Sequence, residues 1–118
     1  MSNKVLGDRG ESCAARYLGA QGYRILAQKY RTKTGEIDLI AKDRDTLVFV
    51  EVKTRRSVRC GLPAEAVNYR KQRRIIQTAM LYLREKQMDQ TPCRFDIVEV
   101  YAAGSEWRIH HLKGAFEV

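Results

Sequence analysis

The segment from Gly35 to Arg55, GEIDLIAKDRDTLVFVEVKTR, constrains the fold of this chain more than any other part of the sequence. Two apolar runs, the second rich in β-branched and aromatic residues, flank a polar stretch at 42–46. This pattern predicts two β-strands joined by a tight turn. Asp38, Glu51 and Lys53 interrupt the apolar runs, although the packing of a sheet does not call for ionisable side chains there. The segment therefore predicts a candidate site as well as a hairpin.

The register of this hairpin decides whether the ionisable residues meet. If residues 44–45 form a two-residue loop, Asp38 lies opposite Glu51, and Glu36 lies opposite Lys53. Directly opposed residues project from the same face, with Cβ atoms about 4.5–5.5 Å apart. Two carboxylates and one ammonium would then converge near the open end of the hairpin. A slip of one residue would separate them, and the loop lacks the Asn-Gly or Asp-Gly pair that fixes such turns most strongly.

Two opposed carboxylates destabilise a sheet unless a cation lies between them. Mg²⁺ takes oxygen ligands, usually one or two carboxylates together with water and substrate phosphates. Asp38 and Glu51 are therefore candidate ligands for Mg²⁺ or Mn²⁺, and Lys53 could orient a water molecule beside them. The alternative is an exposed strand face that carries an ordinary Glu36–Lys53 ion pair, because antiparallel sheets often have one solvated face.

Asp38, followed after a turn by Glu51-Val52-Lys53, resembles the D…(D/E)-x-K signature of the restriction-endonuclease-like nuclease superfamily. The wider pattern is similar to that of the YraN-like bacterial family, a family without an assigned activity. The matching elements are Gly10-Glu11, Gly35–Ile40, Phe49–Arg55, Lys71 and Arg94-Phe95-Asp96. One departure is Ile37, which stands where the eponymous superfamily motif has proline.

This resemblance implies an α/β fold with a restriction-endonuclease-like core, in which helices flank a central mixed β-sheet in the order α-β-β-β-α-β-β. It implies a metal-dependent endonuclease that hydrolyses phosphodiester bonds in DNA, with branched or repair intermediates as substrates by analogy, and a homodimer. Mg²⁺ or Mn²⁺ would be held by Asp38, Glu51 and the carbonyl of Val52. Lys53 would position the attacking water. Glu11 would assist the metal and Lys71 would contact the scissile phosphate.

The charge balance points to an anionic partner. The chain has 22 Lys and Arg against 14 Asp and Glu, a formal net charge of +8. Nucleic acid is the leading candidate and an anionic membrane surface the second. The candidate nucleic-acid contacts are Arg55, Arg56, Arg59, Arg70, Lys71, Arg73 and Arg74. A non-enzymatic nucleic-acid-binding module and an adaptor for acidic proteins are the alternative functions.

The remaining patterns predict one domain over residues 1–118. No apolar run has the length of a signal peptide or a membrane span, so we expect a cytoplasmic protein with no membrane partner. Helices are expected at 8–21, with Asp8 as N-cap and Glu11 in a capping box, and at 64–87. Strands are expected at 23–30, 94–101 and 106–112, besides the hairpin. The residues expected to face the core from the second helix are Val67, Ile75, Ile76, Ala79, Met80 and Leu83.

Overall fold

The computed structural model describes residues 2–56 and 67–118, with the side chain of Ala103 excepted. The elements are α1 (Asn3–Ala20), β1 (Arg24–Thr32), β2 (Gly35–Asp43), β3 (Thr46–Arg55), α2 (Tyr69–Glu85), β4 (Cys93–Ala103) and β5 (Glu106–Phe116). The predicted order α-β-β-β-α-β-β is confirmed. The predicted contact Arg59 lies outside the described residues. None of the described helices is long and apolar enough to cross a membrane.

The strands form a single mixed sheet in the order β1-β2-β3-β4-β5. Neighbouring strands are antiparallel except β3 and β4, which run parallel. A parallel pair needs a long crossover, and α2 lies within that connection. The central strand β3 is buried on both faces over residues 47–52, as expected for a strand covered on both sides.

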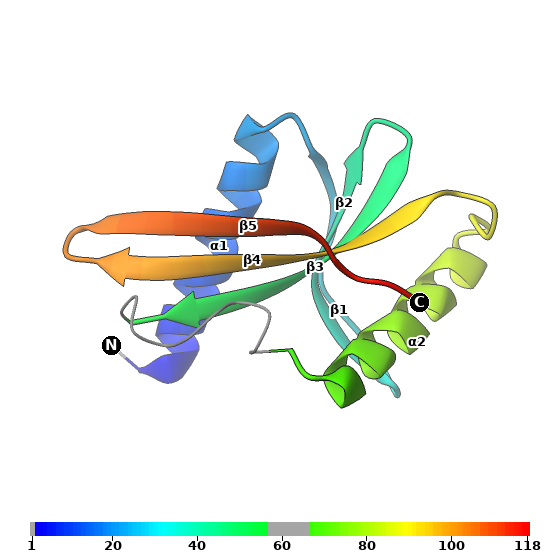
Figure 1. The fold of residues 1–118 in the computed structure, drawn as a ribbon, viewed down its shortest axis with the longest axis horizontal. Helices are drawn as coiled ribbons and strands as arrows, with labels where there is room; N and C mark the ends of the chain where they lie inside the picture. The colour runs from blue at the N-terminus through cyan, green and yellow to red at the C-terminus, as the bar shows by residue number, and fades with distance from the viewer. Residues whose placement is uncertain (1, 57–66) are drawn as a thin grey trace.

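The two helices cover opposite faces of this sheet (Figure 1). Val48 and Val50 of β3 pack in the cluster that contains buried residues of α1. Leu47 and Phe49 pack in the cluster that contains buried residues of α2. Side chains alternate along a strand. Glu51 therefore projects toward the α2 face.

The helix α1 begins earlier than predicted. Ser2 is its N-cap, and the Ser2 hydroxyl accepts a hydrogen bond from the Val5 N–H at 3.1 Å. Asp8 lies inside the helix, where its carboxylate accepts a hydrogen bond from Lys4 Nζ at 2.8 Å. The predicted N-cap at Asp8 is wrong, and so is the capping box at Glu11. The end is as predicted, since Gly22 follows the C-cap with φ of +94°.

The helix α2 begins later than predicted. Asn68 is its N-cap and accepts a hydrogen bond from the Lys71 N–H at 2.9 Å, and Val67 lies before the helix. The predicted start at residue 64 lies outside the described residues, and the described residues 67–68, predicted as helical, precede the helix instead. Five of the six predicted core residues are buried, but Met80 is 48% exposed. The thioether lies at the edge of the apolar stripe, where helical periodicity alone does not separate buried from exposed positions.

Candidate functional site

The predicted hairpin register holds over most of its length. Asp43 pairs with Thr46, and the ladder continues to the pair Leu39–Val50. Arg44, in the two-residue loop, has φ of +56°, a left-handed conformation that closes the turn. The ladder then ends one pair before the predicted pairing of Asp38 with Glu51.

The ladder ends because the Val52 N–H is bonded to the side chain of Asp38 and not to a backbone carbonyl of β2. Asp38 Oδ2 accepts a hydrogen bond from the Val52 N–H at 2.7 Å. Glu36 contacts Arg31, with Oε1 and Nε 3.2 Å apart. The predicted cross-strand pairing of Glu36 with Lys53 is therefore wrong, and among the described residues the ion pair of the alternative interpretation does not form, since Lys53 faces Glu51 instead. Asp38 and Glu51 still lie close enough for each to interact electrostatically with the other, although not as a regular cross-strand pair.

Asp38 and Glu51 are held in an environment that disfavours their charges. Burial is the largest cause that raises the pKa of Asp38, and the neighbouring carboxylate of Glu51 is the second; together they raise it to about 7. The Val52 N–H opposes this shift by stabilising the carboxylate. The pKa of Glu51 is also raised, again with burial as the main cause. Such buried pairs cluster at functional sites.

Two lysines face the carboxylate of Glu51. Lys53 Nζ lies 3.8 Å and Lys71 Nζ lies 3.6 Å from Glu51 Oε1, and both oppose the rise in the Glu51 pKa. Lys53 comes from the same strand and Lys71 comes from α2. Glu51 is 6% exposed, whereas the Lys71 side chain is 45% exposed. The ammonium groups thus lie between the buried carboxylates and solvent, where an anionic substrate would approach.

The helix α1 brings Glu11 to the same region. Gly10 is buried against Thr54 of β3, and a Cβ atom on Gly10 would lie 1.9 Å from Thr54 Oγ1. Only glycine allows this approach of helix to strand. Glu11 Oε1 is buried without a hydrogen bond, although Lys29 Nζ approaches it at 3.1 Å. The charge of Glu11 contributes to the raised pKa of Asp38.

Lys29 was not predicted as part of this region. The residue has φ of +52° in the middle of β1, and its ammonium also contacts Asp8 Oδ1 at 3.1 Å. These two carboxylates raise the pKa of Lys29 by favouring its charged form, with Asp8 as the larger cause. No sequence pattern marks this contact, because it joins a helix to an edge strand. Lys29 therefore supplies the cation that Glu11 faces in this structure.

The described side chains around Asp38 provide oxygen ligands for a metal ion but no complete protein cage. Within the described residues, no group of three or more His, Cys, Asp and Glu side chains is arranged to enclose one. Mg²⁺ needs only one or two protein carboxylates, and Asp38 with Glu51 provides that number. Glu11 Oε1 has no hydrogen bond of good geometry, and in this structure it faces Lys29 Nζ at 3.1 Å. The donor set therefore fits a hard divalent cation that completes its shell with water and substrate oxygen atoms. The predicted role of the Val52 carbonyl stays a prediction.

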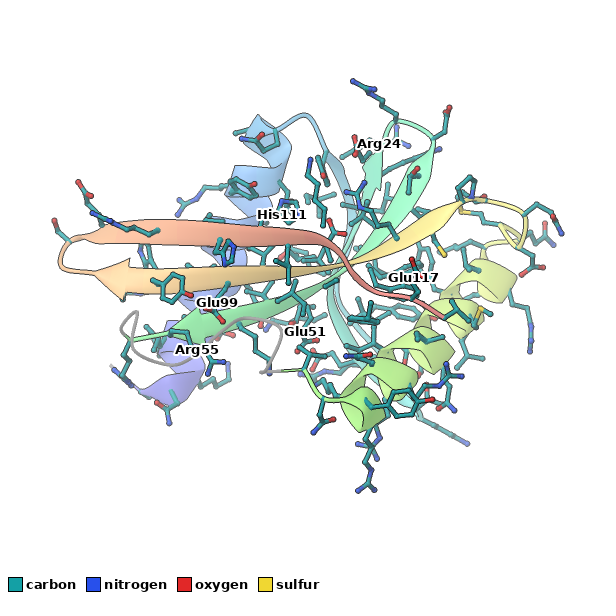
Figure 2. The ribbon with its side chains drawn as sticks, in the orientation of Figure 1. Arg24, Glu51, Arg55, Glu99, His111 and Glu117 are labelled. Carbon is teal, nitrogen blue, oxygen red and sulfur yellow. The ribbon has the colours of Figure 1, made fainter. Side chains whose placement is uncertain are left out.

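The predicted nucleic-acid contacts fall into two groups. Arg55 Nε lies 3.4 Å from Oε2 of the fully buried Glu99. Figure 2 labels both side chains. Arg56 donates a hydrogen bond to Asn3 Oδ1 at 2.9 Å. These two guanidinium groups are therefore engaged within the protein. The exposed group lies at the start of α2 and comprises Arg70, Lys71 and Arg74, with Arg73 partly buried beside them.

Comparison with known proteins identifies the family. A model of an uncharacterised protein family, UPF0102, matches residues 10–100. The chain belongs to this family. It is 46% identical to a UPF0102 protein of Clostridioides difficile, over 98% of this chain and 100% of that protein. It is 56% identical to a UPF0102 protein of Symbiobacterium thermophilum, over 85% and 84% of the two chains, respectively. The matched range contains Glu11, Asp38, Glu51, Lys53 and Lys71.

Proposed function

We propose that this protein is a metal-dependent nuclease that hydrolyses phosphodiester bonds in nucleic acid, with DNA as the expected substrate. The observation that carries the proposal is the buried Asp38–Glu51 pair with raised pKa values, faced by two lysines. Asp38 accepts the Val52 N–H and Glu51 faces two ammonium groups, yet the pKa of both acids stays raised. A bound Mg²⁺ or Mn²⁺ would relieve the repulsion that remains between the two carboxylates.

The chain's own residues have separate roles in this proposal. Asp38 and Glu51 hold the cation, and the Val52 N–H keeps Asp38 in place through its hydrogen bond. The cation supplies Lewis-acid chemistry to the reacting phosphate and water. Lys53 positions the attacking water and stabilises negative charge that develops on the phosphate. Lys71, more exposed, contacts a phosphate oxygen from the α2 side.

The resemblance to restriction-endonuclease-like nucleases supports the same reading. Those enzymes also use an aspartate on one strand and a D/E-x-K element on the next, and here both elements lie on adjacent strands of one mixed sheet. Fold resemblance alone does not assign an activity. The proposal therefore depends on the chemistry of the site. If the acids do not support hydrolysis, the basic surface at the start of α2 favours a non-enzymatic nucleic-acid-binding module.

A nuclease panel tests the proposal. Single-stranded, duplex and branched DNA and RNA would be incubated with the protein in Mg²⁺, in Mn²⁺ and in chelator. We expect cleavage of at least one substrate in either metal and none in chelator. Cleavage that persists in chelator would refute metal dependence. Binding without cleavage in every metal condition would leave the binding module as the function.

The basic surface at the start of α2 should provide phosphate contacts. Replacing Arg70, Arg73 and Arg74 together by alanine is expected to weaken DNA binding similarly for all sequences, since phosphate contacts carry no sequence information directly. The slope of log affinity against log salt should flatten by up to about 3, roughly one for each lost contact. Fluorescence anisotropy at several salt concentrations measures both effects. The control triple replaces the exposed Arg84, Lys86 and Arg108. Equal slopes for the two triples would remove this surface from the interface.

A further inference from the structure

A second group of polar side chains lies at the other end of the β2–β3 hairpin, beside its turn. A cavity of ≈ 280 Å³ is lined there by residues that include Tyr17, Tyr23, Arg44, His111 and Lys113. Arg44 lies about seven residues of extended strand, or ~23 Å, from Glu51. Figure 2 labels His111 on β5, away from Glu51. This cavity is therefore separate from the carboxylate site.

A buried hydrogen-bond network forms the floor of this cavity. Asp96, fully buried, accepts hydrogen bonds from Arg94 Nε at 2.9 Å and from the Gly114 N–H at 2.9 Å. Its other oxygen lies 2.7 Å from His111 Nε2, and His111 Nδ1 lies 3.0 Å from the Tyr17 hydroxyl. These partners lower the pKa of Asp96 despite its burial, which by itself would raise that pKa. Asp96, Arg94 and His111 each contact at least two other polar groups, which fixes their positions beside the cavity.

One donor in the cavity is left unused. The Tyr23 hydroxyl accepts a hydrogen bond from Arg94 Nη2 at 2.7 Å. A guanidinium can only donate, so this bond leaves the proton of the Tyr23 hydroxyl available. None of the described residues accepts that proton in a hydrogen bond. A buried hydroxyl with an unused proton beside a polar cavity is set up to donate to a ligand.

The charges around the cavity favour an anion. Arg44 and Lys113 line it, and neither forms an ion pair with a described residue. Arg44 also lines a neighbouring cavity of ≈ 300 Å³ together with Arg24 and Lys42. Asp43 opposes this charge, but its carboxylate faces Arg94 at 3.4 Å. Arg44 and Lys113 thus outnumber Asp43 in the lining of this cavity, and Arg24 and Lys42 add positive charge from the neighbouring one.

We propose that this cavity binds a phosphate group, with the Tyr23 hydroxyl donating to one phosphate oxygen while Lys113 and Arg44 neutralise its charge. A tetrahedral oxyanion matches three donors that approach from different elements, and phosphate hydrogen bonds to charged donors are strong. The volume leaves room for several waters around the ligand, at about 30 Å³ each. The phosphate is either free or the terminal phosphate of a nucleic acid, and the test distinguishes these sources.

The proposal is tested by nuclear magnetic resonance of the full chain. Inorganic phosphate would be titrated at constant ionic strength, with chloride alone as reference, while the signals of Tyr23, His111 and Lys113 are followed. We expect saturable shifts that chloride does not reproduce. Tyr23→Phe and Lys113→Gln should each weaken binding about 10-fold or more, the range for a hydrogen bond involving a charged group. Lys86→Gln, an equal charge change on an exposed residue of the opposite face, should bind as wild type does.

The same titration separates this inference from the nuclease proposal. Lys53→Ala should retain the shifts, since Lys53 lies at the other end of the hairpin. An oligonucleotide with a 5′-phosphate is compared with its 5′-hydroxyl form: tighter binding of the first assigns the site to a nucleic-acid end. Equal binding of the two, with inorganic phosphate still bound, assigns it to free phosphate. Absence of saturable shifts, or unchanged binding in both Tyr23→Phe and Lys113→Gln, would overturn the proposal.

Discussion

Replacing Asp38 by asparagine is expected to stabilise the metal-free protein at pH 8, by about 1–3 kcal/mol. Burial and the charge of Glu51 raise the pKa of Asp38 to about 7, so at pH 8 most of the folded protein carries a charge on Asp38 that its surroundings disfavour. Asparagine removes one charge. Its side-chain carbonyl can still accept the Val52 N–H that Asp38 accepts at 2.7 Å. Most substitutions at partly buried polar positions destabilise a protein, so a gain would be diagnostic.

The raised pKa of Asp38 also predicts how the free energy of unfolding changes with pH. Between the ordinary Asp pKa of about 3.8 and the raised value of about 7, the folded state binds a proton that the unfolded state has released. The free energy of unfolding of the wild type should therefore fall as pH rises from 4 to 7. Glu51, whose pKa is also raised, acts in the same direction. Asp96, whose pKa is lowered, acts oppositely but only at more acidic pH.

Urea denaturation at pH 5 and pH 8 in chelator measures this effect. The wild type should lose more stability between these pH values than Asp38→Asn does, and comparing the two changes cancels the contribution of the histidines. Asp89→Asn, at an exposed position beyond α2, should behave like wild type. An Asp38→Asn variant that is less stable than wild type at pH 8 would show that the carboxylate is well satisfied in the folded state.

Replacing Lys53 by alanine is expected to slow cleavage by about 10²–10³. Lys53 lies 3.8 Å from Glu51 and is assigned to the water and the developing charge, not to the cation. Affinity for Mn²⁺ should therefore stay near that of wild type. Single-turnover cleavage of the best substrate at saturating metal measures the chemical step apart from product release.

Lys86→Ala is the matched control for this prediction. It removes the same charge from an exposed lysine at the end of α2, where the ammonium lies 5.9 Å from the Tyr82 ring centroid. A general loss of attraction for DNA would slow both variants alike. Equal rates for the two lysine variants would remove Lys53 from the catalytic assignment.

The hairpin that carries the site could be predicted because the pairing of two adjacent strands depends on nearby residues alone. Loop length and side-chain alternation were enough to give the ladder from Asp43–Thr46 to Leu39–Val50. Loop length and alternation did not predict where the ladder ends. It ends because the Asp38 side chain accepts a hydrogen bond from the Val52 N–H, and a sequence pattern does not indicate such a contact. Side-chain alternation predicted that Glu51 and Lys53 share a face, and the structure places Lys53 Nζ 3.8 Å from Glu51 Oε1. The predicted pairing of Glu36 with Lys53 fails because it lies beyond the end of the ladder.

Two kinds of feature were not predicted from the sequence. One is the choice between two competing N-cap residues, and the other is contacts between residues that lie far apart in the sequence. Ser2 and Asp8 are both good N-cap residues, and the helix begins at the earlier one, which includes the buried Leu6 in its first turns. The contact of Tyr17 with His111 joins residues 94 positions apart, so only the folded sheet reveals it. Gly10 could be singled out by resemblance, but its close approach to Thr54 became evident only in three dimensions.

The most direct test of the central claim is the Mn²⁺ affinity of the wild type, Asp38→Asn and Glu51→Gln, measured by calorimetry at pH 8 without nucleic acid. The wild type should bind weakly, because few protein ligands are available. Both variants should bind at least about 10-fold more weakly, a loss of roughly 1.4 kcal/mol or more, while circular dichroism shows an intact fold. Asp89→Asn should bind as wild type does. Equal affinity in all four proteins would contradict the assignment of Asp38 and Glu51 as the metal site.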